Sequence, residues 1–223
     1  MSNPIKPTIK TEFFSLALLI LTAAASVFFY NNLPERIATH WNFAGEVDGW
    51  GSGPMQAIIF PLIIIGMYFM FLLIPYLDPR KERYEQFSKV YHIFKNIILA
   101  MMVVVYFLMC LNGLGYNLPV GIITPIMIGF LFIIMGNYMA KLKRNWFVGI
   151  KTPWTMSSEE VWNKTHRVGG KMFILAGLLM MVGIIVPNSW KLAVFIITMV
   201  ILLVGTIGYS YIAYLQEKKK KNL

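Results

Sequence analysis

The sequence predicts an all-α integral membrane protein with six transmembrane helices and both termini in the cytoplasm. Composition is the first observation behind this prediction: 57% of the 223 residues are hydrophobic and only 13% are charged. A soluble domain of this size has about 25% charged residues. The second observation is the length of the apolar runs, which is close to the roughly 20 residues that a helix needs to cross a bilayer core. The third is a strongly one-sided distribution of basic residues.

The six predicted spans follow one another with short connections. Leu33-Pro34 ends the first span, and Pro187-Asn188 forms the turn between the last two, because proline removes a helical hydrogen bond. Residues 84–95 are predicted to be helical already and to lead into the third span. In order, the predicted spans are residues 13–30, 55–76, 94–114, 118–139, 170–186 and 190–215.

Basic residues mark one side of the predicted bundle. Of the 20 Lys and Arg, only Arg36 and Lys191 fall on the other side. An excess of basic residues marks the cytoplasmic face, so both termini are predicted to lie inside, and an even number of spans agrees. The net charge of +10 therefore does not indicate contact with nucleic acid. Basic residues at the inner surface instead attract anionic lipid.

Two polar loops stand out between the apolar runs. The inner loop, residues 140–169, combines Lys and Arg with Trp and Phe, which is typical of a membrane interface. The outer loop, residues 33–54, is the only outer segment long enough to recognise an extracellular ligand. We divide the chain into an N-terminal membrane domain, residues 1–93, and a second membrane domain, residues 94–223.

The outer loop has three readings. His40, Glu46 and Asp48 are residue types that bind zinc or exchange protons, but their spacing matches no metal signature, and we predict no metal or cofactor. Alternatively the loop is a compact turn, with tight bends at Asp48-Gly49 and Gly51. In the third reading it binds a ligand, because rigid aromatic rings are typical binding anchors. The ligand-binding candidates are His40, Trp41, Asn42, Asp48 and Trp50.

The inner loop contains a helix start. Ser157 followed by Glu160 has the form of a capping box, which predicts a helix that begins near Ser158 and continues into the fifth span. Residues 147–154 read as an extended, re-entrant or surface stretch. Three readings stay open for the loop: it binds phospholipid head groups, it docks a cytoplasmic protein, or it holds an active site. The docking candidates are Asn137, Asn145, Lys151, Thr152, Pro153, Trp154, Trp162 and Arg167.

The apolar runs themselves offer little chemistry. No ionisable residue lies well inside any predicted span, which disfavours a proton-coupled pump. Asn137 stands beside Gly136, which permits close helix approach, and we predict that Asn137 takes part in an interhelical hydrogen bond. The sequence has no Gly-rich phosphate loop, no His-Glu-x-x-His and no Gly-x-Ser-x-Gly, so no enzyme is predicted.

Two sets of residues resemble known families. The inner set comprises Gly136-Asn137, Asn145, residues 149–155 (GIKTPWT), Val161-Trp162 and Arg167. It resembles the signature of the SdpI family, bacterial membrane proteins that include immunity proteins against a secreted peptide toxin. The family typically has Arg where this chain has Lys151. The outer set resembles an uncharacterised membrane domain that often precedes the SdpI-type segment. It comprises Pro34, Ile37, His40-Trp41-Asn42, Gly45 and Asp48-Gly49-Trp50.

The resemblance implies a multi-pass protein of the bacterial cell membrane without catalysis. It implies protection against a secreted antimicrobial peptide toxin, and signal transduction in which a cytoplasmic transcriptional repressor is recruited to the membrane. The expected partners are membrane lipid, the toxin and the repressor, with no direct contact to nucleic acid. Two alternatives stay open: a transporter or permease for a peptide or lipid, and a membrane enzyme that uses His40 with Asp48.

Overall fold

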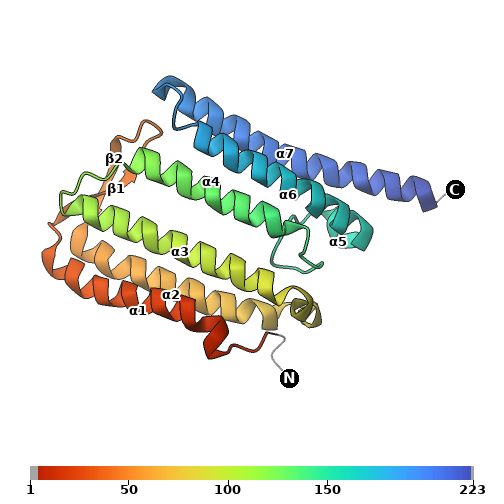
Figure 1. Cartoon of the computed structure of the whole chain (residues 1–223), viewed down its shortest axis with the longest axis horizontal. Coiled ribbons are helices and arrows are strands. Elements are labelled where there is room, and N and C mark those ends of the chain that lie inside the picture. Colours follow the sequence, from red (N-terminus) through yellow and green to blue (C-terminus); the bar gives the residue numbers. More distant parts are fainter. Residues whose placement is uncertain (1–4, 222–223) are drawn as a thin grey trace. The chain divides into compact units, whose positions relative to one another are not determined.

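The computed structural model describes residues 5–221 and is almost entirely helical (Figure 1). Its long helices are α1 (Ile9–Asn32), α2 (Gly53–Leu77), α3 (Ser88–Gly113), α4 (Val120–Met139), α6 (Glu159–Val182) and α7 (Asn188–Lys221). The shorter elements are β1 (Arg36–Trp41), β2 (Val47–Ser52), the 3₁₀ helix η1 (Lys81–Phe87) and α5 (Pro153–Ser157). The predicted all-α membrane architecture is confirmed, and a β-hairpin is added between α1 and α2.

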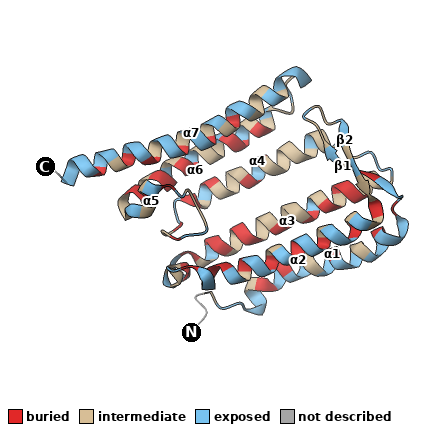
Figure 2. Ribbon diagram, turned by 180° about the vertical axis from the view of Figure 1, so that it is seen from behind, coloured by how far each residue is buried: buried red, intermediate tan, exposed pale blue. Residues whose placement is uncertain are grey.

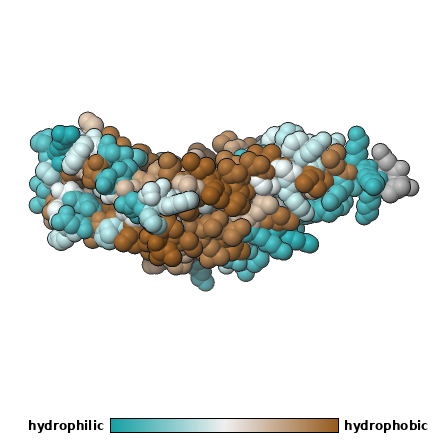
Figure 3. Space-filling model, turned by 90° about the horizontal axis from the view of Figure 1, so that it is seen from above, coloured by the Kyte–Doolittle hydropathy of each residue, from teal (hydrophilic) through white to brown (hydrophobic). Residues whose placement is uncertain are grey.

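Five stretches in the described part of the chain are long and apolar enough to cross a membrane: α1, α2, η1 with α3, α4, and α7. The fifth predicted span, residues 170–186, is the one missing from these five; it lies in the second half of α6, whose first half carries charged residues. The count of six spans therefore stays a prediction. Figure 3 shows apolar side chains (brown) over the middle of the visible face and hydrophilic ones (teal) toward its ends.

The polar start of α6 was predicted almost correctly. The helix begins at Glu159 and continues without a break into the predicted fifth span. Its cap is Ser158 and not Ser157: the Ser158 hydroxyl accepts a hydrogen bond from the Val161 amide (3.3 Å). Ser157 is instead the last residue of α5, and its hydroxyl donates to the Trp154 carbonyl (3.0 Å). The cap moved by one residue because a second short helix precedes it.

The contacts divide the chain into two compact units. The loop unit combines Ile74–Tyr91 with Ile128–Leu223 and the first six residues, and the hairpin unit combines Pro7–Leu73 with His92–Met127. Each unit is described by itself below. The domain boundary predicted near residue 93 concerns sequence modules and stays a prediction.

In the hairpin unit, α1, α2 and α3 share one core. The Phe29 ring packs edge-on against Tyr106 (5.6 Å between ring centroids). The hydroxyls of Ser26 and Tyr106 both donate to the carbonyl of Ala57, at 2.7 and 3.2 Å. Ile37 of β1 is buried in the same core, so the hairpin is anchored to the helices. Figure 2 shows buried residues (red) along α3.

A buried ion pair in the hairpin unit was missed by the sequence prediction. The Lys95 ammonium on α3 donates to the Glu12 carboxylate on α1 (2.5 Å), and both side chains are almost fully buried. The Ser15 hydroxyl donates to Asn96 beside them (2.7 Å). The prediction had counted Lys95 among the basic residues of the cytoplasmic face. Pairing makes its burial tolerable, since an unpaired buried charge is strongly destabilising.

In the loop unit, α4 and α6 approach through a glycine seam, which we define as Gly129, Gly136, Gly170 and Gly177. A Cβ on Gly136 would lie 2.5 Å from the Gly170 carbonyl oxygen, and one on Gly170 would lie 2.6 Å from that of Gly136. The second pair is equally reciprocal, at 2.7 Å for Gly129 and 2.5 Å for Gly177. The close approach predicted at Gly136 is thus confirmed.

Asn137 does not make the interhelical hydrogen bond that was predicted. Its amide donates to the Ile133 carbonyl one turn earlier in α4 (2.9 Å), and the side chain is exposed. The two backbones are close enough to pack without a polar link, because the seam has no side chains to separate them.

Candidate functional site

The outer loop folds into an antiparallel hairpin in the hairpin unit. Its tight turn lies at Asn42–Glu46 rather than at the predicted Asp48-Gly49 and Gly51, which are part of β2. The Asn42 side-chain oxygen accepts hydrogen bonds from the amides of Ala44 (2.9 Å) and Glu46 (3.0 Å). Asn42 therefore closes the turn, which is a common role for asparagine.

The glycines of β2 let the two strands approach each other. A Cβ on Gly49 would lie 2.8 Å from the Cβ of His40, and one on Gly51 would lie 2.9 Å from a methyl carbon of Thr39. The Asp-Gly-Trp-Gly run is thus a close-packing pattern instead of a bend. The pairing is irregular around His40, which is where the two polar candidates meet.

His40 and Asp48 lie within hydrogen-bond distance of each other. The His40 Nδ1 is 2.5 Å from an Asp48 carboxylate oxygen, and both side chains are largely in contact with solvent. Within residues 5–221, no three His, Cys, Asp or Glu side chains gather as a metal site would need. The pair can fix a polar group of a ligand, or it can shuttle a proton.

Exposed apolar side chains surround this pair. Trp50 is 53% exposed, and Phe43 and Val47 are also exposed. The Arg36 guanidinium lies 5.0 Å from the centre of the Trp50 ring, a distance typical of a cation–π contact. Trp41 is half-buried and packs against the core. The hairpin thus presents aromatic rings on a base that the core holds in place.

In the inner loop, the Gly149–Thr155 run wraps around a buried histidine. The Ile150 amide donates to the Nε2 of His166 (3.0 Å), and the His166 Nδ1–H donates to the Trp162 carbonyl (2.9 Å). These contacts require the neutral imidazole. Burial lowers the pKa of His166 to about 4, so the ring stays neutral at physiological pH. Gly149 has φ +120°, and a Cβ there would lie 2.4 Å from Nε2.

The second half of the run forms α5 and ties it to α7. Thr152 caps the helix by accepting from the Thr155 amide (3.2 Å), and Pro153 occupies the first turn. The Thr152 hydroxyl donates to the Ser210 hydroxyl on α7 (3.1 Å). The Trp154 ring lies 4.9 Å from the Tyr211 ring of the same helix. The predicted extended stretch therefore ends in a short capped helix.

Lys151 and Asn145 hold the preceding turn. The exposed Lys151 ammonium donates to the carbonyls of Trp146 (3.2 Å) and Phe147 (3.0 Å). The buried Asn145 side-chain oxygen accepts from the amides of Phe147 (2.9 Å) and Val148 (2.7 Å). Both residues thus shape the backbone of the loop.

The remaining inner-loop candidates differ in exposure. Trp162 is fully buried, its indole N–H donates to the Leu142 carbonyl (2.8 Å), and its ring stacks on His166 (3.9 Å). Trp154 is half-buried, whereas Pro153 and Arg167 are exposed. Buried members of the signature, Trp162 above all, support the loop from within.

A further polar network was missed by the sequence prediction. The buried Asp78 carboxylate accepts hydrogen bonds from the Arg80 amide (2.8 Å), the Tyr84 hydroxyl (2.9 Å) and the Trp146 amide (2.8 Å). Asp78 therefore links the inner loop to the α2–α3 connection, which contains η1. The only signal for it in the sequence is one acidic residue at the end of an apolar run.

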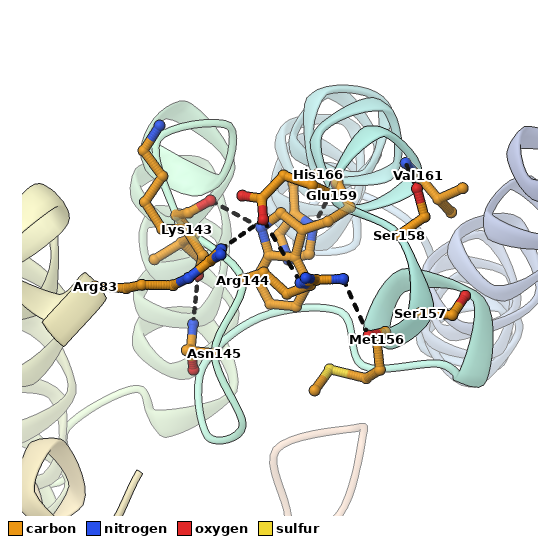
Figure 4. A network of polar contacts seen from close by, with 12 residues as sticks. Arg83, Lys143, Arg144, Asn145, Met156, Ser157, Ser158, Glu159, Val161 and His166 are labelled. Carbon is orange, nitrogen blue, oxygen red and sulfur yellow. Dashed lines mark hydrogen bonds and ion pairs between the residues drawn. The ribbon is translucent and has the colours of Figure 1, made fainter. Parts of the chain in front are cut away.

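Two arginines converge on the first residue of α6 (Figure 4). The Arg83 guanidinium contacts the Glu159 carboxylate at 2.5 Å, and the Arg144 Nε lies 3.6 Å from the same oxygen. Arg144 also donates to the Met156 carbonyl (3.3 Å). An acidic residue in the first turn favours the helix dipole, so Glu159 stabilises α6 while it holds both arginines.

The spans and the two polar surfaces define a multi-pass membrane protein. Residues 141–210 match the model of the SdpI/YfhL protein family, and residues 17–65 match the model of a domain of unknown function, DUF1648. The chain is 24% identical over 205 residues to the immunity protein SdpI of Bacillus subtilis (strain 168). The aligned region covers 92% of this chain and 96% of that protein. No solved structure matches the chain. The predicted resemblance is confirmed, and the protein belongs in the bacterial cell membrane.

Proposed function

We propose that this protein is a membrane immunity protein, which protects its cell from a secreted antimicrobial peptide toxin and signals the encounter to a cytoplasmic repressor. Similarity to an immunity protein over nearly the whole chain supports this role. The observation that carries the proposal is the outer hairpin, whose exposed rings stand on a buried base.

The hairpin suits an apolar peptide that arrives at the outer leaflet. Trp50 and Phe43 offer rigid contact area with few rotatable bonds, so little side-chain entropy is lost on binding. The exposed His40–Asp48 pair can bind a polar end of the peptide. Because Ile37 and the turn at Asn42 hold the hairpin in shape, the rings are preorganised for binding.

Trp50→Ala is expected to abolish most of the protection against the toxin while the protein still accumulates in the membrane. Loss of one central aromatic anchor typically weakens binding by about 2 kcal/mol or more, roughly thirtyfold. The measurement is survival of a deletion strain that carries each variant, over a range of toxin concentrations.

The matched control is Trp190→Ala, which removes a tryptophan that is 63% exposed in the first turn of α7. It is expected to keep full protection. Full protection by Trp50→Ala at normal abundance would remove the hairpin from the mechanism. Equal losses in both variants would indicate a general effect of surface tryptophan.

The inner loop is the proposed docking surface for the repressor. Its exposed or partly exposed candidates Lys151, Pro153, Trp154 and Arg167 lie on the predicted cytoplasmic side, with Asn137 nearby in the sequence. The capped turn of α5 and the contact of Trp154 with Tyr211 keep this surface in one conformation.

Lys151→Ala is expected to weaken recruitment of the repressor and to leave membrane insertion unchanged. The substitution removes two hydrogen bonds to loop carbonyls and an exposed charge. Lys151→Arg is the matched control, because a guanidinium can serve both carbonyls at once. The measurement is membrane localisation of the fluorescently tagged repressor after toxin addition. Normal localisation with Lys151→Ala would leave the loop as a lipid anchor only.

The enzyme alternative is favoured by one observation, the short contact between His40 and Asp48. A carboxylate that orients an imidazole is the arrangement of a general base. An enzyme would convert the toxin, so the toxin's mass after incubation with the protein decides between the two roles. The transporter alternative lacks such support, because Thr22, Asn112 and Thr198 bond to carbonyls of their own helices.

A further inference from the structure

Three arginines lie close together in the loop unit. Arg80 and Arg83 come from the connection between α2 and α3, and Arg144 comes from the inner loop. Burial lowers the pKa of Arg144, the charge of Arg80 lowers it further, Glu159 opposes the shift, and Arg83 adds to it. Arg83 and Arg144 contact the same Glu159 oxygen, and the charges of Arg80 and Arg83 both act on Arg144.

Acidic side chains offset this positive charge only in part. Glu159 is the carboxylate that contacts Arg83 and Arg144. The oxygens of Asp78 are occupied by two backbone amides and the Tyr84 hydroxyl. The two carboxylates, Glu159 and Asp78, thus carry less charge than the three guanidinium groups.

Two donors of the cluster are buried without an acceptor. Within the described residues, the Arg80 Nη1 and the Arg144 Nε are inaccessible to solvent and have no hydrogen-bond partner. Unsatisfied buried donors cost free energy, more so when they are charged. The side chains themselves remain reachable, with 17% of Arg144 and 28% of Arg83 exposed.

Exposed aromatic rings border the arginines. The Arg80 guanidinium lies 5.7 Å from the centre of the Trp146 ring, and the Trp146 and Phe147 side chains are exposed. Aromatic rings beside basic residues are typical of the level where lipid head groups meet acyl chains. The whole group lies on the predicted cytoplasmic side, where anionic lipid is concentrated.

We propose that Arg80, Arg83 and Arg144 bind the phosphate of an anionic phospholipid, with Trp146 and Phe147 against its acyl chains. A guanidinium pairs with phosphate through two parallel hydrogen bonds, and the exposed parts of the Arg83 and Arg144 side chains are where the phosphate would make them. The bound lipid links the α2–α3 connection to the inner loop. This site does not depend on the proposed role in immunity, since it is tested without toxin.

The test uses the purified full-length protein in detergent and phosphatidylglycerol as the probe, with binding followed by native mass spectrometry. The Arg80→Gln and Arg144→Gln variants are each expected to bind phosphatidylglycerol about tenfold more weakly, the effect of one charge-assisted contact. The matched control is Lys141→Gln, which removes an exposed charge on the same loop; its binding is expected to stay within about twofold of the wild type.

Phosphatidylcholine and glycerol phosphate provide the other two arms of the experiment. Equal binding of phosphatidylcholine would overturn the proposal, as would an equal loss with Lys141→Gln. Displacement of the lipid by an equal concentration of glycerol phosphate would assign the site to a soluble phosphate and overturn the lipid. Unchanged lipid binding in the arginine variants, with lost recruitment of the repressor, would assign the cluster to a protein partner instead.

The Arg144→Lys variant separates a loss of lipid binding from a failure to fold. It keeps the charge and loses the planar fork, so it is expected to bind with intermediate affinity. Thermal unfolding in phosphatidylcholine alone should be the same for all variants. If Arg144→Lys binds as weakly as Arg144→Gln at equal stability, the planar fork and not the charge alone binds the phosphate, which supports the proposal. Binding of the lipid by Arg144→Gln as tightly as by the wild type would overturn it.

Discussion

Gly136→Ala is expected to lower the free energy of unfolding of the loop unit by about 3 kcal/mol, because overpacking a close contact forces backbones apart. The new Cβ would lie 2.5 Å from the Gly170 carbonyl oxygen, a backbone atom that has no rotamer to escape through. The seam is reciprocal at both of its contacts, so relief at one glycine pair moves α4 along its whole contact with α6.

The control for this effect is Gly208→Ala, a helical glycine of α7 with open space where its Cβ would stand. Alanine is the better helix former by up to about 1 kcal/mol, so this variant is expected to be as stable as the wild type or slightly more. Thermal unfolding in detergent measures both. Equal stabilities of the two variants would show that α4 and α6 do not need the glycine seam.

Gly149→Ala is expected to disrupt the inner loop and with it the docking of the repressor. Alanine at φ +120° is strained by about 1–2 kcal/mol, and its Cβ would lie 2.4 Å from the His166 Nε2. Relief of that contact breaks the hydrogen bond from the Ile150 amide, which adds about 1 kcal/mol. Limited proteolysis of the inner loop reports the opening directly.

Gly115→Ala separates the strain from the collision. Gly115 also has a positive φ, +93°, but its Cβ would meet open space. Backbone strain is therefore the only expected loss of stability in this variant, and its inner loop is expected to stay resistant to protease. If Gly115→Ala and Gly149→Ala open the loop equally, the contact with His166 has no part in it.

The same contact makes the loop sensitive to acid. The pKa of His166 is lowered to about 4, so the neutral ring is favoured in the folded loop. Below about pH 6.5 the unfolded chain binds a proton that the folded loop excludes. The stabilising contribution is complete above that pH and declines as the pH falls toward 4. In His166→Gln, protease resistance should lack this decline.

Local signals in the sequence determined the class of protein, the positions of most helices and one helix start. Apolar runs near the thickness of a bilayer predict helices wherever they occur, because the backbone has no other partner in lipid. The start of α6 was predicted within one residue, since a serine cap and a following glutamate are both local. Gly136 also indicated a close approach of two helices, which the seam confirms.

The tertiary structure decided what those local signals leave open. Alternation in the outer loop did not indicate the hairpin, because Gly49 and Gly51 contribute no side chains to a pattern; their meaning comes from His40 and Thr39 on the other strand. Asn145 and Trp162 looked like surface residues of a polar loop, yet both are buried supports. Spacing along the chain does not tell which face of a loop turns inward.

The polar networks were the least predictable feature. Glu12 and Lys95 are 83 positions apart, and Arg83 and Glu159 are 76 apart. The distribution of charge along the sequence places Lys95 and Arg83 on the cytoplasmic side and indicates no partner for either of them. Opposite charges that are far apart in the sequence come together only when distant segments pack. Packing also excludes water from the pair, and the exclusion of water decides whether a charged side chain is a solvated anchor or part of a site.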